Sequence, residues 1–199
     1  MFNYSNIFDN EALTYAKYRE LVDDLLAVGK TTGPDHSEEL LHYTKMNVQR
    51  MKRVEKTTIL NDELLTAIDN VKQHYRFLVM SEGWCGDAAQ IVPVIDKMVS
   101  AAPDKFSLRL LLRDQHLSIM DEYLTNGGRA IPVVLVLNDE GEVVLPKWGP
   151  RPAVLQSLRT AWQKEGLDSV KIGELLHGWY AKDKTQETQK EFAALLRKL

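Results

Sequence analysis

The chain has 199 residues, of which 44% are hydrophobic and 27% charged, a composition typical of a globular protein with a packed core. This length suits one large domain or one domain with an appendage, rather than two full domains. The net charge is −3, and residues 58–150 carry 13 acidic against eight basic side chains. Because a phosphate backbone is bound by clustered Lys and Arg, we expect no nucleic acid partner.

The apolar runs and the N-terminus argue against membrane insertion and secretion. The longest nearly unbroken apolar run, residues 130–137, is far shorter than the roughly 20 residues that cross a bilayer, so no membrane partner is expected. The first residues lack the basic start, apolar stretch and small-residue cleavage site of a secretory signal, which favours the cytoplasm.

Cysteine and histidine usage limits the metal chemistry. The only cysteine, Cys85, excludes an intrachain disulfide and a multi-thiolate metal site. The five histidines show no metal-ligand spacing, and we expect them to be structural or exposed. No metal site is predicted.

Helical spacing of apolar residues dominates the N-terminal part. It predicts a helix over residues 10–28 and a longer one from Ser37 to about Lys56. The second helix has a basic end, which can serve a partner or a membrane surface, but three glutamates dilute the charge. We therefore expect residues 1–57 to form an N-terminal helical extension packed on the core.

The central part alternates between strand-like and helical patterns in the order β-α-β-α-β-β-α, after a short helix over 62–73. The expected strands are 77–80, 108–112, 131–137 and 142–145, and the expected helices are 85–99, 118–124 and 153–164. Helical crossovers make the first strands parallel, whereas a turn at 138–141 makes the last two an antiparallel hairpin. The sequence thus predicts an α/β domain over 58–165, with a mixed central sheet covered on both faces. Two C-terminal helices follow within 166–199.

The segment that carries chemistry is Trp84-Cys85-Gly86-Asp87, between the end of a strand and the start of a helix. A thiol at a helix N-terminus faces free backbone N–H groups and the positive end of the helix dipole, which favour the thiolate. Asp87 acts in the opposite direction if its carboxylate turns toward the sulfur. The direction of the net effect on the Cys85 pKa stays open at this point.

On these residues the chain resembles the thioredoxin-like superfamily. Trp84-Cys85-Gly86 stands where such proteins open their redox helix, Pro93 matches the proline of that helix, and Ile131-Pro132 matches the family's cis-proline. Glycines at 141 and 149 also agree. The closest likeness is to a bacterial branch with an N-terminal helical extension. The resemblance implies a three-layer α/β/α sandwich in which Pro132 lies beside Cys85.

Two departures from the family pattern bear on function. Ala88 stands in place of the second cysteine, and Val79 in place of a buried carboxylate under the first. A mixed disulfide on Cys85 would then persist until an external thiol such as glutathione arrived, as in monothiol glutaredoxins. The resemblance thus implies monothiol thiol–disulfide exchange through Cys85, with glutathione as co-substrate and no other cofactor.

The expected site combines Cys85 as nucleophile with substrate contacts from its neighbours. Trp84 would form a flat apolar platform beside Gly86. Ile131 and Pro132 would align an extended partner by strand-like docking. These contacts suit protein or small-molecule thiols and disulfides.

The two charged site residues, Asp87 and Arg129, have ordinary structural roles as alternatives to functional ones. For Asp87, stabilising the helix start is favoured over catalysis. Arg129 is expected to face the cysteine, where it would pair with Asp87 or Glu82 or bind a carboxylate such as glutathione's, and a surface salt bridge is the alternative.

A second function stays open beside thiol exchange. The protein would then be a non-catalytic thioredoxin-like module that docks a protein or peptide in the groove beside Pro132. The sequence leaves the oligomeric state open.

Overall fold

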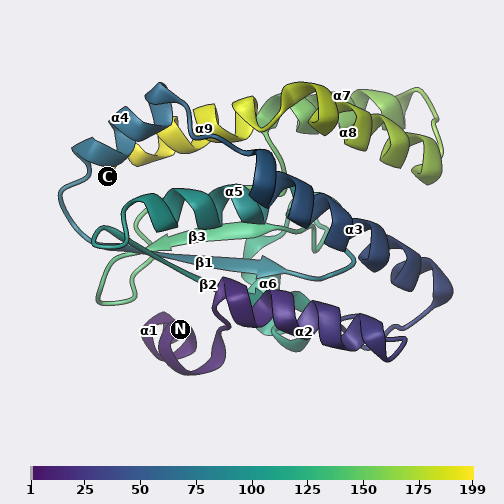
Figure 1. The fold of residues 1–199 in the computed structure, drawn as a ribbon, viewed down its shortest axis with the longest axis horizontal. Helices are drawn as coiled ribbons and strands as arrows, with labels where there is room; N and C mark the ends of the chain where they lie inside the picture. The colour runs from purple at the N-terminus through teal and green to yellow at the C-terminus, as the bar shows by residue number, and fades with distance from the viewer. Residues whose placement is uncertain (1) are drawn as a thin grey trace.

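A computed structural model describes residues 2–199, and its centre is a three-stranded sheet (Figure 1). The strands are β1 (Tyr75–Ser81), β2 (Phe106–Leu112) and β3 (Val133–Leu137), in the order β2-β1-β3. β1 pairs with β2 in parallel and with β3 antiparallel. The predicted mixed α/β sheet is confirmed.

Nine α-helices surround the sheet in the described part of the chain. They are α1 (Tyr4–Asn6), α2 (Tyr15–Ala27), α3 (Glu38–Thr57), α4 (Asp62–Asn70), α5 (Ala88–Ala101), α6 (Leu117–Met120), α7 (Ala153–Lys164), α8 (Ser169–Asp183) and α9 (Gln186–Leu196). A π-helical turn (Ile7–Glu11) follows α1, and short 3-10 turns (Arg113–Gln115, Asp121–Tyr123) flank α6. None of the helices in residues 2–199 is both long and apolar enough to cross a membrane.

Side-chain caps explain where several helices begin. Thr14, Ser37, Asn61 and Asp168 each precede a helix and accept a hydrogen bond from a backbone N–H of its first turn. Such caps satisfy donors that the helix itself leaves free. They fix the starts of α2, α3, α4 and α8.

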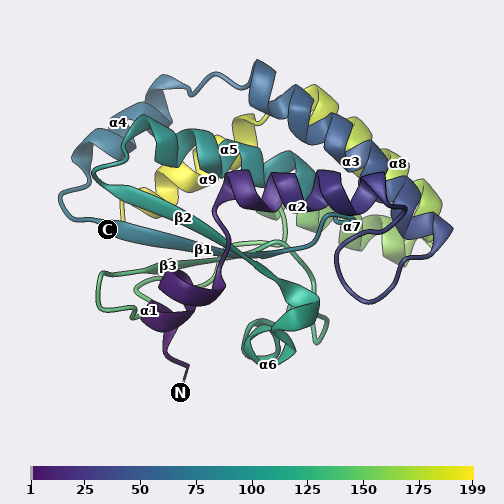
Figure 2. The ribbon, with the colours of Figure 1, turned by 60° about the horizontal axis from the view of Figure 1, so that its bottom comes forward.

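The two faces of the sheet are covered unequally (Figure 2). On one face, Phe77 of β1 packs edge-on against Phe106 and contacts Phe192 of α9, beneath the layer that contains α5. On the other face, the π-helical turn contributes Phe8, which lies under the guanidinium groups of Arg76 and Arg109. The predicted sandwich is present, with a thick helical layer on one face and short segments on the other.

The predicted hairpin strand over 142–145 is wrong, because the pairing beside β3 is interrupted. Val143 bridges Leu137 and Trp148 bridges Val134. The two bridges are therefore five residues apart in this segment but only three residues apart in β3. The extra residues bulge out, and one of them, Pro146, has no N–H to donate. The segment covers the outer edge of β3 without forming a strand.

The first predicted helix also starts later than expected. Its proposed beginning, near residue 10, lies in the π-helical turn, and α2 begins only at Tyr15. In between, Leu13 exchanges two backbone hydrogen bonds of 2.8 Å with Leu110 of β2. This contact occupies part of the free edge of the sheet, where an unpaired strand invites aggregation.

Candidate functional site

Cys85 lies in the turn between β1 and α5. Its N–H donates to the Glu82 carbonyl at 3.0 Å, and its own carbonyl accepts from Ala89 at 3.1 Å, the first helical hydrogen bond. The Ala88 N–H donates to Cys85 Sγ at 3.4 Å. The sulfur therefore occupies the place of a capping oxygen at the N-terminal end of the helix.

The start of β3 lies next to this sulfur. The Ile131–Pro132 peptide bond is cis, as the resemblance implied, and the Cys85 thiol donates to the Ile131 carbonyl at 3.3 Å. Because β3 runs antiparallel to β1, its first residues meet the last residues of β1. Sheet topology thus places Cys85 beside residues that lie 46 positions further along the chain.

Burial decides the charge of Cys85. The residue is 7% exposed. Burial, with the Asp87 carboxylate adding to it, raises the thiol pKa to about 12, although the Ala88 N–H and Arg151 act in the opposite direction. The thiol is therefore protonated at neutral pH in this conformation.

Asp87 forms a buried ion pair instead of a helix cap. Its carboxylate pairs with Arg151 at 2.5 Å and accepts a hydrogen bond from the Tyr180 hydroxyl at 2.7 Å. It makes no capping hydrogen bond to α5. Capping of α5 by an Asp87 hydrogen bond is therefore wrong, because Arg151 and Tyr180 occupy its oxygens, although Asp87 does stand at the N-terminal end of α5.

Arg129 does not pair with Asp87 or Glu82, so that expectation is wrong as well. Its guanidinium makes two hydrogen bonds with Asp121, at 2.7 and 2.9 Å, and both side chains are about half exposed. The two expected partners are occupied elsewhere: Asp87 by Arg151, and Glu82 by the Asp114 N–H at 2.8 Å. Arg129 thus forms the surface salt bridge that was its alternative.

A pocket of about 380 Å³ opens above Cys85. Six of the predicted site residues line it, namely Trp84, Cys85, Gly86, Asp87, Arg129 and Ile131. The other walls come from α3, from α8 and from loops at this end of the sheet: Leu40, Tyr43, Arg50, Arg113, Ala130, Arg151, Gly173, Leu176 and His177.

Pro132 is the predicted site residue that does not line this pocket. It is buried. Gly149 approaches it so closely that a Cβ at this glycine would lie 2.2 Å from the Pro132 carbonyl oxygen. The Pro132 side chain therefore offers no wall to this pocket, and the expected contact of a partner with Pro132 stays a prediction.

Comparison with known proteins agrees with this geometry. The sequence model of the thioredoxin family matches residues 33–163, more than half of the chain. The chain belongs to the thioredoxin family. No sequence among the curated proteins matches it.

Two solved structures share the fold of this thioredoxin-family protein. One is the protein of unknown function PA1234 from Pseudomonas aeruginosa, with a TM-score of 0.67 and 17% identity over 100% of this chain and 99% of that one. The other is an HIV epitope scaffold, with a TM-score of 0.57 and 19% identity over 94% of this chain and 99% of that one. At these identities the likeness concerns the fold alone.

His177 of α8 is a site residue that the sequence analysis missed. Its ring covers Gly86 so closely that a Cβ there would lie 2.7 Å from the ring. Burial, with Arg50 adding to it, lowers the His177 pKa to about 4, so the ring is neutral at pH 7. Helical spacing puts Gly173, Leu176, His177 and Tyr180 on one face of α8, but no sequence signal shows that this face lies against Cys85.

Arg50 of α3 is the second residue that was missed. Its Nη1 donates to Asn47 Oδ1 at 2.7 Å, and no carboxylate in residues 2–199 lies within ion-pair distance of it. The other arginines of the pocket differ, since Arg129 and Arg151 are paired as described above. Arg113 pairs with Asp114 and lies over the Trp84 ring. The expected Trp84 platform is therefore already covered.

Proposed function

We propose that the Cys85 pocket binds a small molecule that carries a carboxylate and a thiol or disulfide, the chemical class of glutathione. The observation that carries this proposal is the Arg50 guanidinium, which lines the pocket without a carboxylate partner among the described residues. A planar guanidinium is the natural partner of a carboxylate, which it can bind through two hydrogen bonds. Arg50 Nη1 lies 3.6 Å from the position of a Cβ on Gly86, next to Cys85.

The size of the pocket and the engaged backbone beside it favour a small ligand over an extended peptide. Its volume of about 380 Å³ falls within the range of small-molecule sites. Ile131 is 4% exposed, and its carbonyl already accepts the Cys85 thiol. Strand-like docking of a peptide would need this backbone free.

In this proposal the Cys85 thiol contacts the ligand by a hydrogen bond and does not react with it. Protonated at neutral pH, it can exchange its hydrogen bond to Ile131 for one to the sulfur or an oxygen of the ligand. The protein then acts as a thioredoxin-fold binding module for a small acidic molecule.

Titration with reduced and oxidised glutathione, followed by NMR of the labelled protein, tests this proposal. We expect saturable shifts at Cys85, Gly86 and Arg50, and an affinity at least roughly tenfold lower for Arg50→Gln, because a charge-assisted hydrogen bond is lost. Lys52→Gln is the matched control, since Lys52 lies on the same helix, exposed and outside the pocket. Equal affinity of wild type and Arg50→Gln, or absence of shifts at the pocket, would contradict the proposal.

Monothiol exchange is a second candidate, favoured by the N–H of Ala88 directed at Cys85 Sγ. In this reaction the thiol loses its proton to solvent, the thiolate attacks a disulfide, and one thiolate leaves as the new mixed disulfide forms. Because Ala88 replaces a resolving cysteine, the mixed disulfide awaits a second external thiol.

Intact-protein mass measurement after incubation with oxidised glutathione tests the exchange reaction. The expected result is one glutathionyl adduct on the wild type, removable by reduced glutathione, and none on Cys85→Ser. An unmodified wild-type protein after prolonged incubation at mildly alkaline pH would rule this candidate out and leave the binding proposal standing.

A further inference from the structure

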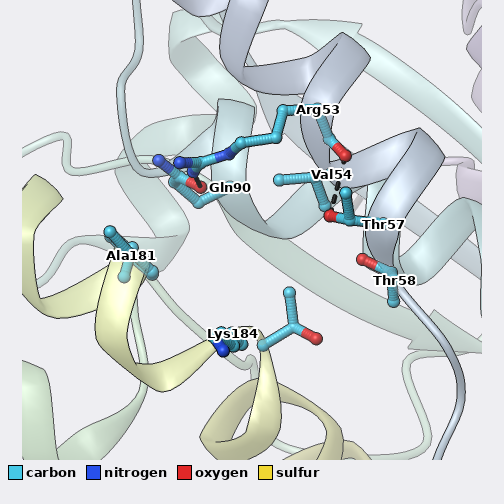
Figure 3. Close-up of a pocket in the computed structure, with 9 residues that line it drawn as sticks. Arg53, Val54, Thr57, Thr58, Gln90, Ala181 and Lys184 are labelled. Atoms are coloured by element: carbon cyan, nitrogen blue, oxygen red, sulfur yellow. Dashed lines mark hydrogen bonds between the residues drawn. The ribbon is translucent and has the colours of Figure 1, made fainter.

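A second hollow of about 360 Å³ lies away from Cys85, where the C-terminal end of α3 meets α5 and the junction between α8 and α9 (Figure 3). Tyr180 lines it and donates its hydroxyl to Asp87, so this side chain stands between the hollow and the cysteine site. We call it the Thr58 hollow, after the buried residue in its wall. None of its lining residues is an Asp or a Glu.

Thr58 is the first observation that points to a ligand. The residue is 5% exposed, and its Oγ1 has no hydrogen-bond partner among residues 2–199. Its backbone is fully engaged, since the N–H donates to the Val54 carbonyl at 2.9 Å and the carbonyl accepts from Lys97 Nζ at 2.6 Å. A buried hydroxyl without a partner costs free energy, so a ligand that satisfies it gains that energy on binding.

Two cations without acidic partners line the same hollow. Arg53 donates from Nη2 to Gln90 Oε1 at 3.1 Å, and this contact holds its guanidinium over α5 (Figure 3). Lys184 stands across the hollow, in the left-handed junction that turns the chain from α8 into α9. Neither side chain forms an ion pair with a carboxylate of the described residues.

Gln90 adds a fourth donor. It is 4% exposed, and its oxygen is taken by Arg53, whereas its amide nitrogen donates to no residue that the structure describes. Arg53, Thr58, Gln90 and Lys184 thus place four donor-bearing side chains in the wall of one hollow, and no acidic residue lines it.

We infer that the Thr58 hollow binds the phosphoryl group of a small phosphomonoester. Two positive charges match the near-double negative charge of a phosphomonoester at pH 7, and its three terminal oxygens can accept several hydrogen bonds at once. A carboxylate offers two oxygens and one charge, and would leave part of this donor set unused.

Calorimetric titration at low ionic strength with inorganic phosphate, glycerol 3-phosphate and acetate tests this inference. We expect saturable one-to-one binding of the two phosphates and none of acetate. The Cys85→Ser protein should bind the phosphates as the wild type does, so this result is independent of the function proposed for the cysteine pocket.

Three variants sharpen the test. Thr58→Val keeps the shape of the side chain and should weaken phosphate binding about tenfold or more, with a melting temperature equal to or above the wild type, because the lost hydroxyl has no partner in the protein. Arg53→Gln should also weaken binding at least about tenfold. Lys56→Gln, an exposed position of α3 that does not line the hollow, should change little.

Three results would overturn the inference: no saturable binding of either phosphate, wild-type affinity in Thr58→Val, or an equal loss in Lys56→Gln and Arg53→Gln. The last of these would mean diffuse attraction to a basic surface rather than a built site.

Discussion

The N-terminal end of α5 and the Ala88 N–H both favour a thiolate at Cys85, whereas burial and the Asp87 carboxylate favour the thiol. Burial is the largest of these effects, and it raises the pKa of the thiol to about 12. A helix N-terminus is therefore insufficient to activate a cysteine when the surrounding residues exclude water from the sulfur.

Asp87 connects the charge of the cysteine to the stability of the protein. Asp87→Asn keeps the shape of the side chain but leaves the buried Arg151 without its counter-ion. Breaking such a pair typically costs about 3–5 kcal/mol of unfolding free energy, which urea denaturation would measure. The Cys85 pKa should fall in the same variant, because the Asp87 carboxylate raises it.

Asp121→Asn is the control for this prediction. It removes the partner of Arg129, but both side chains are exposed, so the unfolding free energy should stay at the wild-type value. Equal stability of Asp87→Asn and Asp121→Asn would show that the buried pair contributes no more than a surface pair.

At the scale of elements, α8 closes the cysteine pocket from above. Gly173, Leu176 and His177 line the pocket from one face of this helix, and Tyr180 on the same face holds it to the core through the hydrogen bond to Asp87. Most residues of α8 are at least partly exposed, and Ile172, Leu176 and Tyr180 are the buried ones. A helix held by so few buried contacts is a natural candidate for local opening.

Tyr180→Phe should loosen this helix. The variant loses a hydrogen bond to a charged group, which is worth about 1.5–3 kcal/mol. We expect faster hydrogen exchange of the α8 amides and faster alkylation of Cys85, while the core strands keep their protection. Tyr123→Phe, which removes a hydroxyl contact with Tyr4 away from α8, should leave both rates unchanged. If Tyr180→Phe alters neither rate, α8 does not control access to Cys85.

The strands, most helices and the turn that holds Cys85 could be predicted from sequence because their signals are local. Apolar runs marked β1, β2 and β3, and the resemblance gave the place and the cis bond of Pro132. The prediction of the hairpin strand over 142–145 was wrong because a bulge depends on pairing with the neighbouring strand, and no local sequence pattern reports that pairing.

The contacts of the site residues could not be predicted for a related reason. Asp87 contacts Arg151 and Tyr180, which lie 64 and 93 positions away, whereas the sequence favoured closer candidates. Arg50 and His177 come from α3 and α8, whose sequence patterns are those of ordinary amphipathic helices. Only the packing of α3 and α8 over the domain brings them to Cys85.

At the scale of the whole molecule, three parts of the chain build one pocket. Arg50 comes from α3, Cys85 from the turn between β1 and α5, and His177 from α8. The stability of the fold and the closure of the site are therefore linked, and titration of a pocket residue should appear in global unfolding.

His177 provides such a test. Its folded-state pKa of about 4 lies below the value of about 6.5 in the unfolded chain. Between these values the unfolded chain binds the extra proton, so the stabilisation present above pH 6.5 is lost as the pH falls toward 4.

His177→Gln should remove this part of the pH dependence. As the pH falls from about 6.5 to 4, the unfolding free energy of the wild type should decrease relative to that of the variant by on the order of 1–3 kcal/mol. Asp96, whose pKa is raised to about 6 by burial, acts in the opposite direction but equally in both proteins. Parallel curves for the two proteins would mean that His177 is not a buried neutral group.

The reaction of Cys85 with iodoacetamide as a function of pH tests the central claim most directly, because it reports both the charge and the accessibility of the sulfur. With a protonated, enclosed thiol, the rate should lie far below that of a free cysteine at neutral pH and keep rising about tenfold for each pH unit up to about pH 10. A rate that reaches a plateau at or below about pH 8 would instead show an exposed thiolate and contradict the account.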